Sequence, residues 1–221
     1  MRLSPELVKI PGMAASFRRA GLTGELMGAM IKGNQERDFM ADANRLLVEL
    51  TKRTKIEVWG WENIPKESGC LIIFNHPSTE KLLPAILTMM VRMNEENGRN
   101  VILPMASEIP MTAKFNEKSS LPGSIWLLKK LQSLYPDTIV PVPTAQHRHD
   151  FLSGRTVAMR KIMRGLTGGG MVLISPEGHT EVDGVMSPVE TYHEGSGRLI
   201  LLHRRWEFQR YRWPFGDLWR R

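Results

Sequence analysis

The chain has 221 residues, of which 42% are hydrophobic and 24% charged, and it carries a net charge of +7. Its single cysteine, Cys70, excludes an internal disulfide framework, and no stretch reaches the roughly 18 apolar residues that span a bilayer. A folded protein with one large domain fits this size and balance. The basic charge leaves nucleic acid, an anionic membrane surface or an anionic substrate as partners.

Residues 1–55 are expected to form an N-terminal helical cap. Apolar residues recur at helical spacing from Phe39 to Leu50, and charged residues lie between them. Four glycines weaken the earlier part of the segment. One interpretation is a membrane-lying face, made by Met13, Met27, Met30 and Met40 with Arg18, Arg19 and Lys32. The other is a helical hairpin that covers a sheet.

From residue 56 to residue 202, short β-rich runs alternate with helical patterns. The runs are 56–59, 70–74, 101–103, 138–142 and 171–175. The pattern predicts a buried helix over 80–93 and an amphipathic helix over 156–166, while residues 104–124 are expected to form a long loop. Alternation of this kind predicts an α/β fold with a mixed sheet flanked by helices.

The tail, residues 203–221, interleaves six aromatic residues with arginines. Such a segment suits a lipid headgroup interface, stacking on single-stranded nucleic acid, or packing of its aromatic rings on the domain. The N-terminus lacks the basic-then-apolar order of a signal peptide, since Lys9, Arg18 and Arg19 interrupt it. We therefore expect a peripheral protein on the cytoplasmic face of a membrane, without a transmembrane helix or signal peptide.

Two of the predicted strands end in groups that can carry out chemistry. His76 follows the run 70–74, with Glu80 four residues later, and Glu177 follows the run 171–175. Functional residues gather at the carboxyl ends of strands in α/β folds, so the two ends predict one site. A histidine oriented by a carboxylate can act as a general base toward a hydroxyl group.

Other chemistries have less support in the sequence. There is no G-x-S-x-G nucleophile elbow, and the glycines at 168–170 precede a strand without a Lys-Ser/Thr pair, so they form a turn instead of a phosphate loop. His147, His149 and Asp150 lack a further metal ligand at suitable spacing. No metal site is predicted.

The arrangement resembles the glycerolipid acyltransferases, the lysophosphatidate acyltransferase-like superfamily with its phospholipid/glycerol acyltransferase domain. Residues 56–65 and 69–78 are similar to that family's V-x-G-x-E-N-x-P block and the N-H-x-S that follows it. Residues 172–181 with Asp183 and Gly184 resemble its F-P-E-G-T-R-S and D-G, and residues 194–199 resemble its K-G-A-x-R-L. The resemblance covers residues 56–202 and marks the chain as a divergent member.

The resemblance implies a transferase of phospholipid biosynthesis and lipid metabolism. His76 would be the base, Glu80 its orienter, and the donor acyl-CoA or acyl-carrier protein, attacked directly by a hydroxyl of a lipid-like acceptor. No cofactor is implied, and nucleic acid is not the expected partner. The residues implied in substrate binding are Asn75, Ser78, Glu177, Gly178, His179, Thr180 and Arg148.

The chain also departs from the family pattern. Lys81 stands where the family has its aspartate, and Thr180 and Pro143 stand where it has its phosphate-binding arginines. Without these arginines an acceptor other than lysophosphatidate or glycerol-3-phosphate is expected, since the bidentate recognition of phosphate is lost. The family's next strand has no counterpart after Leu202. An alternative is therefore a catalytically lapsed member that acts as a lipid-binding or scaffold module.

Overall fold

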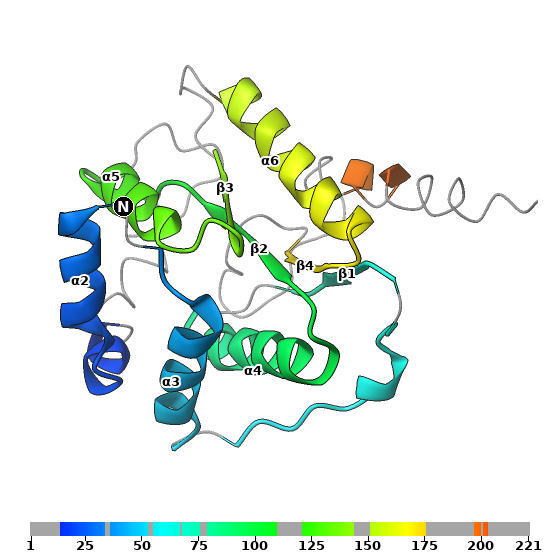
Figure 1. Cartoon of the computed structure of the whole chain (residues 1–221), viewed down its shortest axis with the longest axis horizontal. Helices are drawn as coiled ribbons and strands as arrows, with labels where there is room; N and C mark the ends of the chain where they lie inside the picture. Colours follow the sequence, from blue (N-terminus) through cyan, green and yellow to red (C-terminus); the bar gives the residue numbers. More distant parts are fainter. Residues whose placement is uncertain are drawn as a thin grey trace, which may run out of the picture.

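The computed structural model describes residues 14–33, 36–52, 55–66, 68–75, 79–109, 121–143, 151–175, 197–199 and 201–202, with 79–81 as backbone only. Four strands form one sheet in the order β1-β4-β2-β3 (Figure 1). Their bounds are Cys70–Ile73, Val101–Ala106, Ile139–Val142 and Met171–Ile174 for β1 to β4. Every described pairing is parallel, so the expected mixed sheet is not found among these strands.

A helix connects each strand to the next, which explains the parallel order. These helices are α4 (Thr79–Asn97), α5 (Ser124–Ser133) and α6 (Phe151–Thr167). Each one returns the chain to the same edge of the sheet, as parallel pairing requires. The helices predicted at 80–93 and 156–166 are thereby confirmed as α4 and α6. No helix was predicted at α5, which begins at Ser124, the last residue of the segment expected to be a loop.

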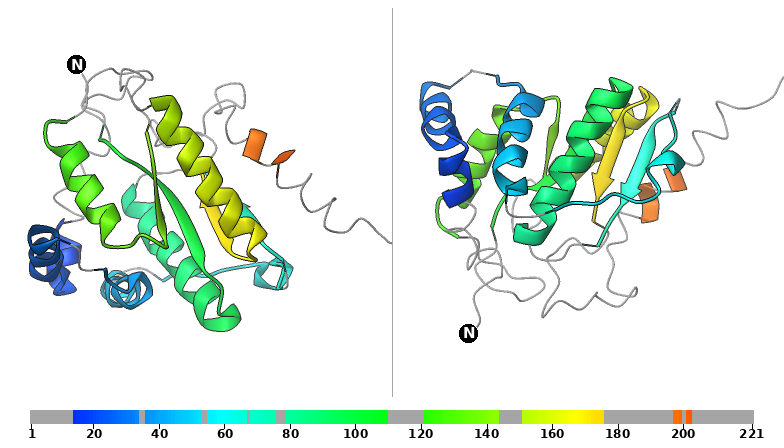
Figure 2. Two further views of the ribbon diagram at one scale, coloured as in Figure 1. Left: turned by 45° about the horizontal axis from the view of Figure 1, so that its top comes forward. Right: turned by 90° about the horizontal axis from the view of Figure 1, so that it is seen from below.

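Helices cover the sheet on both faces, with α6 on one side and α4 on the other (Figure 2). The central strand β4 is buried along its whole length. Val172 and Ile174 point into the cluster that α6 completes, whereas Met171 and Leu173 pack with Met90 and Met93 of α4. This division follows from the two-residue period of a strand, and burial on both sides explains why the strand is apolar throughout.

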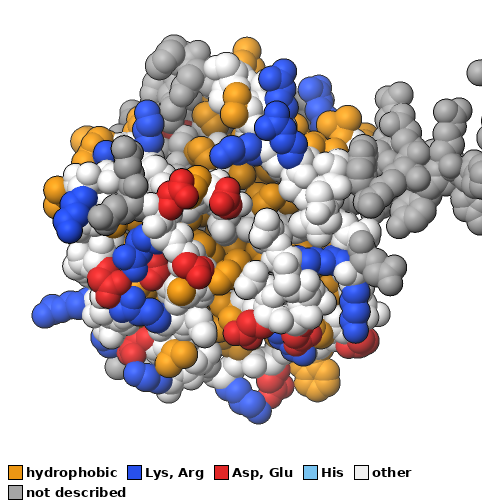
Figure 3. All heavy atoms as spheres, in the orientation of Figure 1, with side chains coloured by type: hydrophobic (Ala, Val, Ile, Leu, Met, Phe, Trp, Pro, Cys, Tyr) orange, Lys and Arg blue, Asp and Glu red, His pale blue; other side chains and the backbone are white. Residues whose placement is uncertain are grey.

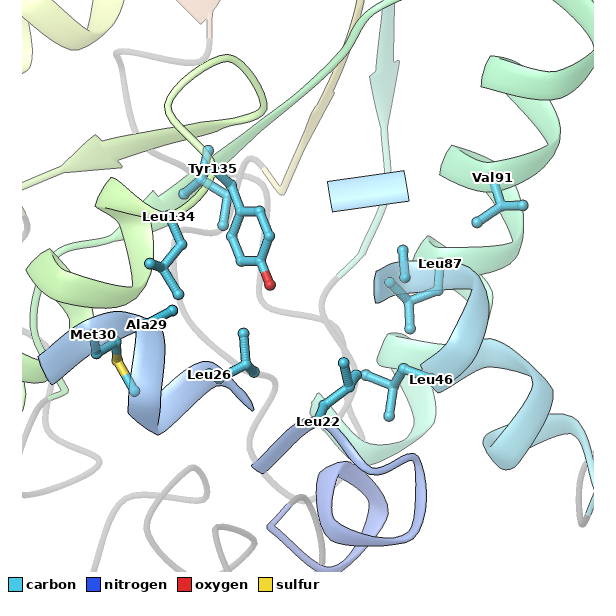
Figure 4. Packing of buried hydrophobic residues seen from close by; sticks show 11 residues of the cluster. Leu22, Leu26, Ala29, Met30, Leu46, Leu87, Val91, Leu134 and Tyr135 are labelled. Carbon is cyan, nitrogen blue, oxygen red and sulfur yellow. The ribbon is translucent and has the colours of Figure 1, made fainter. Parts of the chain in front are cut away.

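The N-terminal helices are α2 (Leu22–Lys32) and α3 (Phe39–Thr51), and residues 14–19 are also helical. Figure 4 shows the apolar cluster into which α2, α3, α4 and the α5–β3 connection send side chains. Of the methionines expected on a membrane face, Met30 is buried in this cluster and Met27 is exposed. Met13 lies outside the described residues. The inner side of α2 therefore covers the domain, while its outer side, which carries Met27, is exposed.

A closed polar cluster fastens these helices to the rest of the domain. Arg37 donates two hydrogen bonds to the buried Asp42, from Nε at 2.7 Å and from Nη2 at 2.8 Å. The hydroxyl of Tyr135 donates to Asp42 Oδ2 at 2.8 Å, and the Arg37 amide donates to the Leu134 carbonyl. Glu25 accepts hydrogen bonds from both Arg37 and Arg45. We call these five residues, Glu25, Arg37, Asp42, Arg45 and Tyr135, the Asp42 cluster.

The segment before β1 differs from its prediction. Residues 56–59 form no strand, and Trp59 is 87% exposed. The chain instead makes the short 3-10 helix η1 (Trp61–Asn63) and is tied to the amino edge of the sheet by Arg99. The Arg99 Nη1 group donates to the carbonyls of Pro65 and Ser68 at 2.8 and 2.7 Å. Among the described strands, none pairs with the β-rich residues 56–59.

Two glycines allow α6 to lie close to the sheet. A Cβ atom at Gly69 would lie 1.9 Å from the carbonyl oxygen of Leu166, and one at Gly165 would lie 1.8 Å from Ile102 Cδ1. The helix therefore approaches the starts of β1 and β2 more closely than a side chain at either glycine would allow. Among the described residues, no helix combines the length and the apolar character that crossing a membrane requires.

Candidate functional site

The candidate site lies at the carboxyl edge of the sheet, where β1 and β4 end next to each other. Ile73 is the register partner of Ile174, and the Phe74 amide donates to the Ile174 carbonyl at 3.1 Å. The two strand arrows point the same way in the right view of Figure 2. Asn75 and Ser175 therefore leave the sheet side by side, although about a hundred residues separate them in the chain.

The two strand ends differ in how far they are exposed. Asn75 is exposed at the end of β1, whereas the Ser175 side chain is only partly accessible after β4. The Ser175 Oγ atom is buried and has no hydrogen-bond partner among the residues that the structure describes. A buried hydroxyl without a partner costs free energy, and such groups occur where a ligand or water completes the site.

The predicted site residues fall mostly outside the described part of the chain. Asn75 is described as above, and Glu80 is the second residue of α4, with its backbone alone described. His76 and Ser78 lie outside the described residues, as do the other predicted substrate-binding residues, Arg148, Glu177, Gly178, His179 and Thr180. The same holds for His147, His149, Asp150 and the tail at 203–221.

A second pair of strand ends brings a buried carboxylate to the same edge. Ser107 and Glu108 follow β2, and both are buried, Glu108 being 2% exposed. The Ser107 hydroxyl donates to Glu108 Oε2 at 2.7 Å, while its amide donates to the Val142 carbonyl at 3.1 Å. These contacts hold the carboxylate where β2 and β3 leave the sheet.

Arg155, in the second turn of α6, lies beside this carboxylate. Its Nε group donates to the Pro143 carbonyl at 3.1 Å, and its guanidinium lies over the ring of Phe151, 4.3 Å from the ring centroid. Burial lowers the pKa of Arg155, and the negative charge of Glu108 opposes that shift. No carboxylate of the described residues lies within ion-pair distance of this guanidinium. A partly buried cation thus lies at the edge, and the acceptor it has within the described ranges is a backbone carbonyl.

Sequence reasoning did not single out Glu108 or Arg155. The available signal was their position: Ser107 and Glu108 directly follow a strand, and Arg155 lies in the early turns of the helix after the next strand. The predicted loop at 104–124 concealed this, because residues 104–106 belong to β2. The position of a charged residue directly after a buried strand is therefore a sequence signal for a site, in addition to its chemical type.

Two further features bear on the assignment. Within the described ranges, no group of three His, Cys, Asp or Glu side chains could hold a metal ion. A cavity of about 640 Å³ lies between α3 and α4, with Leu47, Val48, Lys52 and Thr88 in its lining. None of its lining residues follows a strand, so this cavity is separate from the carboxyl edge.

Comparison of the chain with protein families, curated proteins and solved structures gives no match. The chemistry available at the carboxyl edge therefore has to be argued from its residues. An exposed amide, a hydroxyl, a buried carboxylate and a partly buried guanidinium suit a polar substrate that carries hydroxyl or anionic groups.

Proposed function

We propose that the protein is a peripheral membrane O-acyltransferase. It moves a fatty acyl group from acyl-CoA or acyl-carrier protein to a hydroxyl of a lipid-like acceptor. The observation that carries the proposal is the parallel pairing of β1 with β4, because the two motif segments, 75–80 and 175–181, follow these strands directly. Strands far apart in sequence could have paired elsewhere in the sheet, and the proposal would then lack its basis.

In the proposed mechanism His76 acts as the general base. Its imidazole takes the proton of the acceptor hydroxyl while the hydroxyl oxygen attacks the thioester carbonyl carbon. The tetrahedral oxyanion then collapses, the carbon–sulfur bond breaks, and the thiolate leaves with the proton from His76. No acyl-enzyme forms. Backbone amides at the start of α4, which begins at Thr79, could stabilise the oxyanion.

Glu80 is the proposed orienter of His76, since it lies in the first turn of the helix that follows. Lys81 holds the position of the family's aspartate, one residue further on, and one residue rotates a helical side chain by about 100°. This shift is the observation that favours the second candidate, a lipid-binding or scaffold module without catalysis.

The test is acyl transfer from labelled long-chain acyl-CoA and from labelled acyl-carrier protein to detergent-dispersed total lipid. His76→Ala should lower product formation by about 10²- to 10⁴-fold, the usual contribution of a general base. His203→Ala, which removes a histidine outside the motifs, is the matched control and should keep full activity. Circular dichroism checks that both variants fold. A wild-type protein without His76-dependent product would favour the scaffold module.

Glu80 is tested on the same assay with a control from its own helix. Glu80→Gln keeps the shape of the side chain but removes its charge, so it should lower activity while leaving substrate affinity nearly unchanged. Glu95→Gln changes an exposed carboxylate of α4 and should have no effect. Equal activity in both variants would remove Glu80 from the mechanism without removing His76.

A further inference from the structure

The helices α2 and α5 lie side by side at one end of the molecule and bury only their inner sides. Leu26 and Met30 of α2 share an apolar cluster with Leu134, directly after α5, and Leu131 of α5 packs against it. Figures 1 and 2 show both helices outside the layer formed by the sheet. The outer sides of these two helices face away from the domain.

These outer sides are apolar where solvent-facing helix surfaces are ordinarily polar. Twelve large hydrophobic residues are exposed in the described part of the chain, and five of them lie on α2 and α5. Ile31 is 74% exposed and Trp126 is 58% exposed, and they are accompanied by Met27, Ile125 and Leu127. On α2, Ile31 lies about 140° around the helix axis from the buried Leu26, given 100° per residue. Its exposure thus reflects the direction in which it points, not a frayed end.

The charges on this surface are mainly positive. Lys32 ends α2, while Lys129 and Lys130 lie on α5, which contains no acidic residue. No described carboxylate forms an ion pair with these three lysines. The one carboxylate of α2, Glu25, is already bound by Arg37 and Arg45. Figure 3 shows hydrophobic and basic side chains next to one another along the left edge, where Figure 1 shows α2 and α5.

We propose that the outer surface of α2 and α5 is the part of the protein that docks on a membrane, with an anionic lipid bilayer as its partner. Apolar side chains flanked by lysines match the boundary between acyl chains and negative headgroups, where tryptophan is also favoured. The inference rests on the peripheral membrane location in the proposed function, but it does not depend on acyl transfer. It places docking on α2 and α5 and not on the aromatic tail at residues 203–221.

Vesicle sedimentation tests this assignment, with vesicles of equal parts phosphatidylcholine and phosphatidylglycerol and with vesicles of phosphatidylcholine alone. The wild-type chain should bind the mixed vesicles more tightly, and added salt should weaken the binding. Ile31→Asp combined with Trp126→Asp should weaken binding by about tenfold or more, since each change removes an apolar side chain from the bilayer boundary. Both positions are exposed, so the fold should remain intact.

The matched control exploits the other exposed sites. Trp59→Asp with Leu152→Asp changes the same number of exposed apolar residues, 87% and 77% exposed, elsewhere on the surface. This control should bind vesicles like the wild type. Equal loss in both double variants, or no loss in the first, would overturn the assignment. A surface used by a second copy of the chain would also overturn it, and would appear as dimerisation in analytical ultracentrifugation that Ile31→Asp abolishes.

A spectroscopic readout separates docking from catalysis. Brominated phospholipid should quench part of the protein fluorescence, and Trp126→Phe should remove that part while Trp59→Phe should not. His76→Ala should bind vesicles normally even if acyl transfer is lost. Conversely, the α2 and α5 variant should keep its activity on detergent-dispersed acceptor. Failure of the proposed reaction and failure of the docking surface are therefore distinguishable.

Discussion

Two buried carboxylates, Asp42 and Glu108, lie in opposite kinds of surroundings. Asp42 accepts hydrogen bonds from Nε and Nη2 of Arg37 and from the hydroxyl of Tyr135, and every member of its cluster has a charged or hydroxyl partner. Glu108 accepts from Ser107, while the neighbouring cation Arg155 donates, among the described residues, to the backbone carbonyl of Pro143 and stacks on Phe151. The members of the first cluster satisfy one another, whereas the Arg155 guanidinium has no side-chain acceptor within the part of the chain that the structure describes.

The difference between these surroundings separates polar groups that stabilise the fold from polar groups that are available to bind a ligand. Burial alone would raise the pKa of Asp42, but the hydrogen bonds from Arg37 and Tyr135 outweigh it and hold the pKa below its ordinary value. At Arg155, burial lowers the pKa and only the charge of Glu108 opposes it. The hydrogen bonds thus fully offset the effect of burial on the pKa of Asp42, whereas the charge of Glu108 offsets only part of the effect of burial on the pKa of Arg155.

The largest expected effect on stability comes from disrupting the Asp42 cluster. Asp42→Ala leaves the guanidinium of Arg37 and the hydroxyl of Tyr135 without their buried acceptor. Loss of one partner from a buried pair costs about 3–5 kcal/mol of the free energy of unfolding. Urea unfolding followed by circular dichroism measures it. A loss below about 1 kcal/mol would mean that the cluster contributes little to stability.

Replacing each arginine by methionine sharpens the comparison. Arg37→Met should cost about 3 kcal/mol, because it leaves the carboxylate of Asp42 buried without its cation. Arg155→Met should change the free energy of unfolding by less than about 1 kcal/mol, since burial already disfavours that charge. Urea unfolding of both variants under the same conditions measures the two changes in the free energy of unfolding. If Arg155 proves as costly to remove as Arg37, the two sites do not differ in the way argued above.

The Asp42 cluster also predicts that the stability of the fold depends on pH. The hydrogen bonds from Arg45 and Arg37 lower the pKa of Glu25 to about 2, and the pKa of Asp42 is lowered as well. These carboxyls therefore contribute stability that is present above their unfolded pKa values, near 4, and is lost as the pH falls toward 2. Thermal unfolding between pH 6 and pH 2 should show the loss, and Asp42→Asn should reduce its size.

The smallest effect expected is at the start of α3. Asp38 caps this helix, since its Oδ1 atom accepts from the amides of Met40 and Ala41 at 2.8 and 3.1 Å. Asp38→Ala should cost about 1 kcal/mol, the usual contribution of an N-cap. Asp38→Ser, which can still accept these bonds, should cost less. Comparable losses in Asp38→Ala and Asp42→Ala would show that capping, and not the cluster, determines how firmly α3 is held.

Much of the fold could be predicted from periodicity, but the gaps have physical causes. The four runs that became strands are short and apolar because the sheet is buried on both faces, and α4 and α6 show clear helical spacing. Residues 56–59 are also β-rich but form no strand, because pairing depends on a neighbour that sequence alone does not reveal. The helix α5 was missed because its exposed Ile125, Trp126 and Leu127 hide the amphipathic pattern of a surface helix.

By itself, the sequence determined the α/β alternation, the helical character of the N-terminal segment and the two strand ends at which chemistry was expected. These are local properties, since each depends on residues within a few turns or one strand. Only the tertiary structure decided that β1 lies beside β4, that Glu108 and Arg155 share the carboxyl edge, and that Asp42 meets Tyr135 across 93 residues of chain. Such contacts depend on which elements pack together, and no local pattern specifies that choice.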